Sequence, residues 1–156
     1  MRNKLRIEAE RHISATDRIG NGLVAGFVAT LVLSALHDPL TLVTEAVGVR
    51  APVAGLLFHF FVGTLLWGGL FGFLHDFLPG PSWLRGVIFA AGGALIVFLA
   101  IAPFSGAGLF CLKLGAYAPV VVGLFHLAYG TILGAIYGKL VDTDEARDHL
   151  AGHPHH

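Results

Sequence analysis

The sequence has little that could cover the surface of a water-soluble protein. Only 13% of its 156 residues are charged, against about 25% in soluble domains, and 55% are hydrophobic. Ten Lys and Arg balance ten Asp and Glu, so no basic excess indicates a nucleic-acid partner. The single cysteine, Cys111, excludes an intrachain disulfide and thiolate-ligated zinc or iron–sulfur centres. A single methionine argues against a Met-lined copper(I) route. The class that remains is an integral membrane protein.

Four long apolar stretches are present instead, at about residues 22–42, 52–74, 86–104 and 119–140. Each approaches the ~20 residues that a helix needs to cross the hydrocarbon core of a bilayer. No stretch alternates with a period of two, which disfavours a β-barrel. The sequence therefore predicts an all-α fold, a transmembrane four-helix bundle over residues 20–141.

The cations indicate an orientation for this bundle. Two of the ten, Arg50 and Lys113, lie on one predicted side of the membrane, and the other eight lie on the opposite side: Arg2, Lys4, Arg6, Arg11, Arg18, Arg85, Lys139 and Arg147. Because cytoplasmic loops carry the excess of Lys and Arg, we expect both termini to be cytoplasmic.

Two polar segments flank the bundle. We expect residues 1–19 to form a short amphipathic helix on the inner leaflet, and residues 142–156 to form a polar, His-rich tail. Within the first segment, Ser14 and Asp17 have the spacing of a capping box at the start of a helix.

An internal repeat is the most specific pattern. Ala-Pro-Val at 51–53 and at 118–120 each precede a histidine, His59 and His126, by the same distance. Gly63-Thr-Leu-Leu then matches Gly130-Thr-Ile-Leu at the same spacing of 67 residues. We therefore predict two tandem helical hairpins related by a pseudo-twofold axis along the membrane normal. That symmetry would place His59 and His126 at equal depth on equivalent helix faces.

Glycines recur in the second and fourth stretches at spacings that favour close helix packing: Gly63, Gly68, Gly72, Gly130, Gly134 and Gly138. Small residues let membrane helices approach where water supplies no hydrophobic drive. We also expect much of this glycine-rich surface to remain for partners.

Histidines within the membrane support three hypotheses, because ionisable residues there are expensive to bury. His59 and His126 could ligate a b-type haem from its two sides. Together with His37 and Asp38, they could instead form a metal-ion or proton site open to the outside. A purely structural alternative is that each imidazole forms a hydrogen bond across the bundle, for instance to Thr64 or Thr131.

Two stretches resemble a family of small four-helix membrane proteins from bacteria and archaea that is described only as a domain of unknown function. They are Phe-Leu-Pro-Gly-Pro at 77–81 through Gly86, and His-Leu-Ala-Tyr-Gly at 126–130 through Gly138. The resemblance covers about residues 20–140. It implies four transmembrane helices in a cytoplasmic membrane and no established reaction. Members encoded beside haem–copper terminal oxidases imply an accessory role in a respiratory complex.

From these observations we expect a protein that is not an enzyme, because the chain holds few candidate catalytic groups. Its expected function is that of a small accessory or stabilising subunit of a respiratory or other redox membrane complex. Its expected partners are the lipid bilayer and either that larger complex or further copies of itself. The alternatives are a b-haem electron carrier and a small transporter or ion-handling protein.

Overall fold

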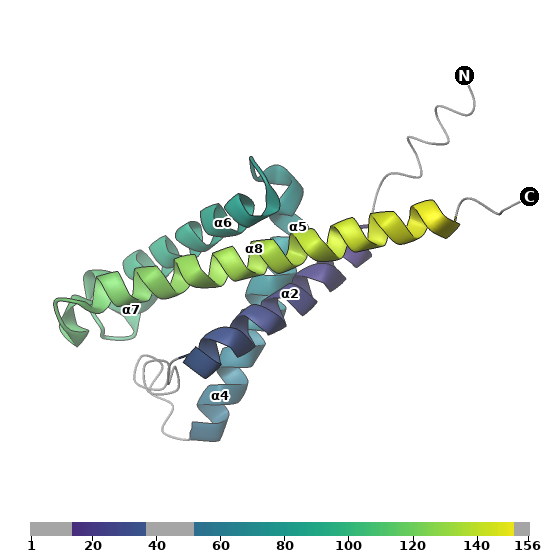
Figure 1. Cartoon of the computed structure of the whole chain (residues 1–156). Coiled ribbons are helices and arrows are strands. Elements are labelled where there is room, and N and C mark those ends of the chain that lie inside the picture. Colours follow the sequence, from purple (N-terminus) through teal and green to yellow (C-terminus); the bar gives the residue numbers. More distant parts are fainter. Residues whose placement is uncertain (1–13, 37–51, 152–156) are drawn as a thin grey trace, which may run out of the picture.

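The computed structural model describes residues 14–36 and 52–151, and every long element in these ranges is a helix. The first long helix is α2 (Ala15–Leu36). The second is continuous through four segments: α4 (Pro52–Phe60), the π-helical η1 (Phe61–Gly68), α5 (Gly69–Leu74) and the 3₁₀ turn η2 (His75–Phe77). The third comprises α6 (Ser82–Ile96), the π-helical η3 (Val97–Ile101) and α7 (Ala102–Phe104). A 3₁₀ segment, η4 (Leu109–Leu114), then leads to the fourth helix, α8 (Ala118–Ala151). Figure 1 shows α6 alongside α8, with α2 crossing beside them.

Four of these stretches are long and apolar enough to span a membrane: Ala15–Ala35, Leu56–Phe77, Ser82–Phe104 and Ala118–Asp144. The predicted transmembrane four-helix bundle is therefore confirmed. The first helix begins before residue 22 because Ser14 caps it. The Asp17 amide donates to the Ser14 hydroxyl oxygen at 3.1 Å, and that hydroxyl donates to the Asp17 carboxylate at 2.6 Å. The Ser14 side chain thus caps the helix as the predicted capping box requires, while the Asp17 carboxylate accepts from the Ser14 hydroxyl and not from its backbone N–H.

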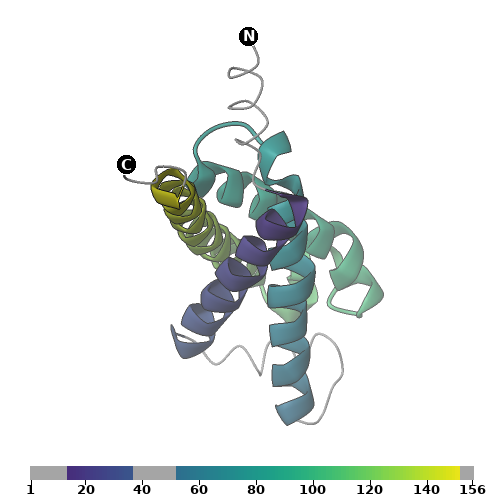
Figure 2. The same ribbon diagram turned by 90° about the vertical axis from the view of Figure 1, so that its right-hand side faces the viewer.

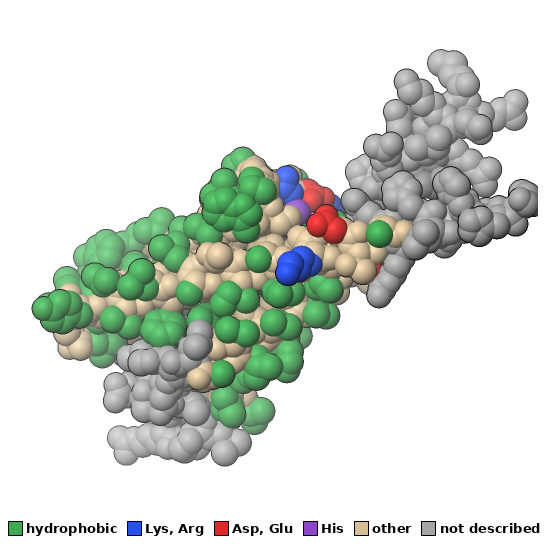
Figure 3. Space-filling view, in the orientation of Figure 1, with side chains coloured by type: hydrophobic (Ala, Val, Ile, Leu, Met, Phe, Trp, Pro, Cys, Tyr) green, Lys and Arg blue, Asp and Glu red, His purple; other side chains and the backbone are tan. Residues whose placement is uncertain are grey.

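The surface matches a bilayer environment. Large apolar side chains such as Phe27, Leu57, Leu95 and Phe104 are exposed along the helices. In Figure 3 hydrophobic side chains cover most of the described surface, and the coloured charges gather near the end at which α2 begins. In water such a surface would drive aggregation, whereas lipid chains or partner helices can cover it.

Each helix pair packs through glycines at a backbone crossing. In the first pair, Gly22 and Gly26 of α2 meet Gly68, and Gly72 meets the backbone of Arg18. In Figure 2 α2 and the second helix meet where α2 begins and splay apart toward α4. In the second pair, Gly86 of α6 meets Gly130 and Gly134 of α8, and a Cβ added at Gly86 would lie 2.9 Å from the Cα of Gly134. Backbones can approach this closely only where both helices lack side chains.

The remaining predicted packing glycines lie at helix contacts as well. Gly63 faces Thr30 of α2, Gly134 faces the backbone of Ser82, and Gly138 faces the Ser82 side chain. The expectation that much of the glycine surface is left for partners is therefore wrong. These glycines are used inside the chain, although Gly20 and Gly92 stay open, with nothing within 4 Å of an added Cβ.

The two crossings do not follow the 67-residue spacing seen in the sequence. Gly68 packs against Gly22 and Gly26 in the way that Gly130 packs against Gly86 and Ala90. Packing thus pairs Gly68, and not Gly63, with Gly130. His59 lies nine residues before its crossing glycine and His126 lies four before its own. The matched sequence spacing is consequently not the spacing that packing uses.

Aromatic rings hold the two helix pairs together at the centre of the bundle. Phe71 and Tyr137 are fully buried, with ring centroids 5.3 Å apart, and Phe89 of α6 lies 5.4 Å from Phe71. Leu133 and the small side chains of Ala25 and Ala29 complete this cluster. This aromatic cluster sets the relative position of the two helix pairs, and so it also sets the size of the space between the helices beside it.

Candidate functional site

A cavity of about 330 Å³ lies between the helices. Its wall is almost wholly apolar and comes from α2, the second and third helices, η4 and α8. The polar or reactive side chains that line it are Thr30, His59, Ser105, Cys111, His126 and Tyr129. The volume falls at the lower end of the range of small-molecule and cofactor pockets, about 300–1,000 Å³, and such pockets are mostly apolar with a few polar groups.

His59 and His126, the predicted ligand pair, line this same cavity. The Nδ1 of His126 lies 2.8 Å from the carbonyl oxygen of Val122, one turn earlier in its own helix. Because a carbonyl only accepts, Nδ1 carries the hydrogen and donates it, and Nε2 keeps the lone pair. The backbone thus fixes the tautomer in which Nε2 can bind a metal or accept a proton.

His59 offers a second nitrogen. Its Nε2 is buried and has no hydrogen-bond partner among the described residues. The Thr64 hydroxyl is likewise buried without a partner there, and Thr131 donates to Leu127 of its own helix at 2.8 Å. The hypothesis of cross-bundle bonds from the histidines to these threonines therefore does not fit the described part of the chain. Burying a polar nitrogen without a hydrogen-bond partner destabilises the folded protein. A ligand or another bonding partner at the Nε2 of His59 would offset this cost.

The metal-ion hypothesis fares differently. Its other members, His37 and Asp38, lie outside the described residues. Within residues 14–36 and 52–151, no group of three His, Cys, Asp or Glu gathers that could hold a metal ion. The described cavity thus supplies two imidazoles but no third ligand of the predicted ion site.

Both π-helical segments border the cavity. Val62, Gly63 and Trp67 of η1 line one part, and Val97 and Ile101 of η3 line another. A π-helix widens the turn and is rare, and short π segments are frequent at functional sites. Neither segment is predictable from the sequence, since nothing in an apolar run of this kind marks where the turn widens.

Cys111 reaches the cavity from an unusual backbone. It and Phe110 adopt positive φ angles, 62° and 54°, which side chains other than glycine rarely do. Cys111 is 4% exposed, and burial raises the pKa of its thiol. The protonated thiol is a poor nucleophile, so this position acts as a small apolar wall residue.

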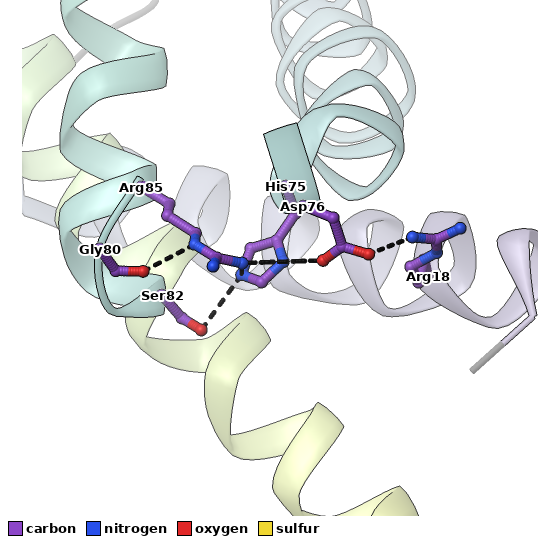
Figure 4. Close-up of polar contacts among 6 residues, drawn as sticks. All are labelled: Arg18, His75, Asp76, Gly80, Ser82 and Arg85. Carbon is purple, nitrogen blue, oxygen red and sulfur yellow. Dashed lines mark hydrogen bonds and ion pairs between the residues drawn. The ribbon is translucent and has the colours of Figure 1, made fainter. Parts of the chain in front are cut away.

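A second polar group, the charged cluster, lies near the starts of α2 and α6. Figure 4 shows its members: Arg18, His75, Asp76, Ser82 and Arg85. Asp76 forms ion pairs with Arg18 of α2 and, at 3.7 Å, with Arg85 of α6. His75 lies between them, with its Nδ1 2.9 Å from Asp76 and its Nε2 3.1 Å from the Ser82 hydroxyl. Arg85 in turn donates to the Gly80 carbonyl at 2.7 Å, which ties the turn before α6 to the cluster.

The charged cluster joins all four long helices. His75 is 6% exposed, and its ring lies against that of Tyr137 of α8, tilted by 37° with centroids 4.3 Å apart. Arg18 supplies the contact from α2 and Arg85 the contact from α6. Asp76 is half exposed, so water reaches one side. We interpret the cluster as a structural connection at the membrane surface.

Four members of these two sites were not predicted from the sequence. Tyr129 donates a 2.5 Å hydrogen bond to the Gly63 carbonyl, yet in the sequence it is one aromatic among many in an apolar helix. Cys111 lies in η4, between the third and fourth helices, and only the fold brings that segment to the cavity. Arg18 and Asp76 are 58 residues apart, and no local signal pairs them.

Comparison with known proteins agrees with the resemblance in the sequence. Neither a curated protein nor a solved structure matches the chain. The model of one family, described as a family of unknown function (DUF6789), matches residues 16–148, which cover nearly all of the four long helices and every residue that lines the cavity. The chain belongs to this family of unknown function.

Proposed function

We propose that this chain is a non-enzymatic accessory subunit of a redox membrane complex and that it holds a flat, largely apolar cofactor in the cavity between His59 and His126. The observation that carries the proposal is that both imidazoles line one apolar cavity of about 330 Å³ while the Nε2 of His59 has no partner in the described chain. A ligand at this nitrogen would remove the cost of burying it alone.

A b-type haem fits these residues. Its iron takes axial ligands from histidine, and bis-His ligation needs two imidazoles with free nitrogens. His126 presents Nε2 because its Nδ1 donates to Val122, the type of second hydrogen bond that metal-ligating histidines make. The apolar wall would exclude water from the ring. When bound, the haem would supply one-electron transfer, and the chain's own groups would hold and orient it.

The wider assignment rests on the surface and the charges. Exposed apolar side chains on all four helices support contacts with lipid and with a larger complex or another copy of the chain. Arg18 and Arg85 lie near the starts of α2 and α6 and share Asp76, Lys139 follows Gly138, which packs on Ser82 at this same end, and Lys113 lies in η4, between the third and fourth helices. By the bias of cations toward the cytoplasm, this distribution supports cytoplasmic termini. The bacterial or archaeal cytoplasmic membrane that we propose rests on the resemblance in the sequence.

The test is a reduced-minus-oxidised absorption spectrum of the protein purified in mild detergent from cells supplied with haem. We expect a Soret band and a sharp α band in the wild type. His59→Ala and His126→Ala should each convert the spectrum to that of a haem with one protein ligand or none, and the double variant should lose the haem. His153→Ala, in the predicted tail, is the control and should keep the wild-type spectrum.

A wild-type protein that is folded and free of haem would overturn the cofactor proposal. The proposal would also fail if the double variant kept the wild-type bands, since the haem would then be bound elsewhere. If a larger complex co-purified with a haem-free chain, the cofactor proposal would fail and the accessory role would be supported as one that acts through packing alone.

A further inference from the structure

The π-helical segment η1 separates His59, which lines the cavity, from Gly68, which packs on α2. Gly68, its last residue, faces α2, and His59 lies nine residues before it. An α-helix turns by about 100° per residue, so nine residues of regular helix would place His59 roughly 180° from the side that meets α2. In that register the imidazole would point away from the bundle.

The structure places His59 elsewhere, in the same cavity wall as Thr30 of α2 and His126 of α8. The π segment explains the difference. Its i→i+5 bonding takes an additional residue into the turn, and each additional residue rotates the preceding helix by about 100°. His59 therefore stands within about 90° of the Gly68 side, where it can face the cavity.

A specific contact holds η1 at its third residue. The Tyr129 hydroxyl donates to the carbonyl oxygen of Gly63 at 2.5 Å, and the Thr30 side chain interacts with the same hydroxyl. Thr30 is 1% exposed and packs directly on Gly63, where an added Cβ would lie 3.2 Å from the Thr30 Cβ. Gly63 is thus held from α8 by a hydrogen bond and from α2 by packing.

We infer that Tyr129 is a positioning residue for the cavity: by holding the Gly63 carbonyl it keeps η1 in the π-helical register and thereby keeps the His59 imidazole turned toward His126. Without the phenol hydroxyl, the Gly63 carbonyl can return to an α-helical bond. The segment α4 then rotates by about 100°, and His59 leaves the cavity. The significance for a ligand rests on the proposed function, but the geometry can be tested without any ligand.

The test uses Tyr129→Phe in protein with isotope-labelled histidine, reconstituted in bilayers that contain a lipid with a spin label on its acyl chain. The spin label broadens NMR signals from side chains that face lipid. In the wild type we expect weak broadening of the His59 signals, and in Tyr129→Phe strong broadening. Tyr117→Phe, the same chemical change at a tyrosine that is 83% exposed, is the matched control and should behave as the wild type.

A second variant distinguishes register from general damage. Deleting Leu65, a half-exposed residue inside η1, removes one residue from the widened turn. His59 then stands eight residues before the crossing glycine, which in a regular α-helix is about 80° from it, inside the cavity. Adding this deletion to Tyr129→Phe should therefore return the His59 signals to weak broadening. If Tyr129 only stabilised the fold, the deletion would further destabilise the Tyr129→Phe protein and would not reduce the broadening of the His59 signals.

The inference is overturned if His59 is broadened equally in the wild type and in Tyr129→Phe, or if the deletion fails to restore it. Should Tyr129→Phe not fold, the deletion alone still decides, because a folded deletion protein with His59 facing lipid contradicts the register argument. The spectrum supplies a separate readout: Tyr129→Phe should convert a bis-His haem to a single-ligand haem. A haem-free wild type would contradict the proposed function. The NMR measurement would still decide the role of Tyr129, because it does not depend on a bound ligand.

Discussion

Replacing Gly86 by alanine should separate α6 from α8. A Cβ at this position would lie 2.8 Å from the amide nitrogen and 2.9 Å from the Cα of Gly134, and closer still to the carbonyl oxygen of Gly130. Ordinary contacts between carbon atoms are about 3.5–4.0 Å, so the helices must part by roughly 1 Å along this crossing. All three atoms belong to backbone, so no side chain can turn aside.

The expected cost is about 2–3 kcal/mol of unfolding free energy, the upper part of the range for overpacked sites. The parting also loosens the contact of Ala90 with Gly130, one turn further along. The assay is reversible unfolding in mixed detergent micelles, with helicity measured by circular dichroism. Gly92→Ala on the same helix is the control, since an added Cβ there meets nothing within 4 Å. That change should be neutral or slightly stabilising, because alanine favours the helix over glycine by up to about 1 kcal/mol.

Equal stabilities of Gly86→Ala and Gly92→Ala would refute the reasoning, since the two variants differ only in what the new methyl group meets. Loss of stability in both would indicate that glycine matters for helix flexibility and not for the crossing.

Two further predictions concern the ends of the bundle. Asp76→Asn should lower the unfolding free energy by about 1 kcal/mol, since Asp76 is half exposed and water partly screens its ion pairs with Arg18 and Arg85. Added salt should reduce the difference in unfolding free energy between this variant and the wild type. A difference that does not depend on salt would contradict the ion-pair explanation. Alkylation of Cys111 by iodoacetamide should be slow in the folded protein at neutral pH and faster at alkaline pH, because burial raises the pKa of the thiol and only the thiolate reacts. Mass spectrometry of folded and SDS-denatured samples measures the alkylation rate. Equal rates in the two samples would show that the thiol is accessible in the folded protein and would contradict this expectation.

The sequence was sufficient for the architecture because membrane helices have a strong local signature. A run of about 20 apolar residues has few alternatives in a bilayer, and Gly and Pro mark where each run stops. The capping box at Ser14 is equally local, since both of its partners lie within one turn. The shared cavity of His59 and His126 could be anticipated from the pattern only in part, as a hypothesis about two histidines on matching helices.

The rest depends on properties that are not local. The choice of Gly68 as the partner of Gly22 depends on how two helices cross, whereas the 67-residue repeat in the sequence matches Gly63, and not Gly68, with Gly130. The π turn of η1 depends on a tyrosine 66 residues later in the chain. Cys111 reaches the cavity only because η4 folds back with two residues at positive φ. In each case the deciding contact joins segments that are distant along the chain.

The most direct measurement for the central claim is native mass spectrometry of the untagged protein released from its own membranes. The account predicts a chain that carries one additional small-molecule mass, that of a haem, and loses it when His59 and His126 are both replaced by alanine. A chain released at its bare polypeptide mass, alone or within a larger complex, would contradict the claim that this cavity is a cofactor site.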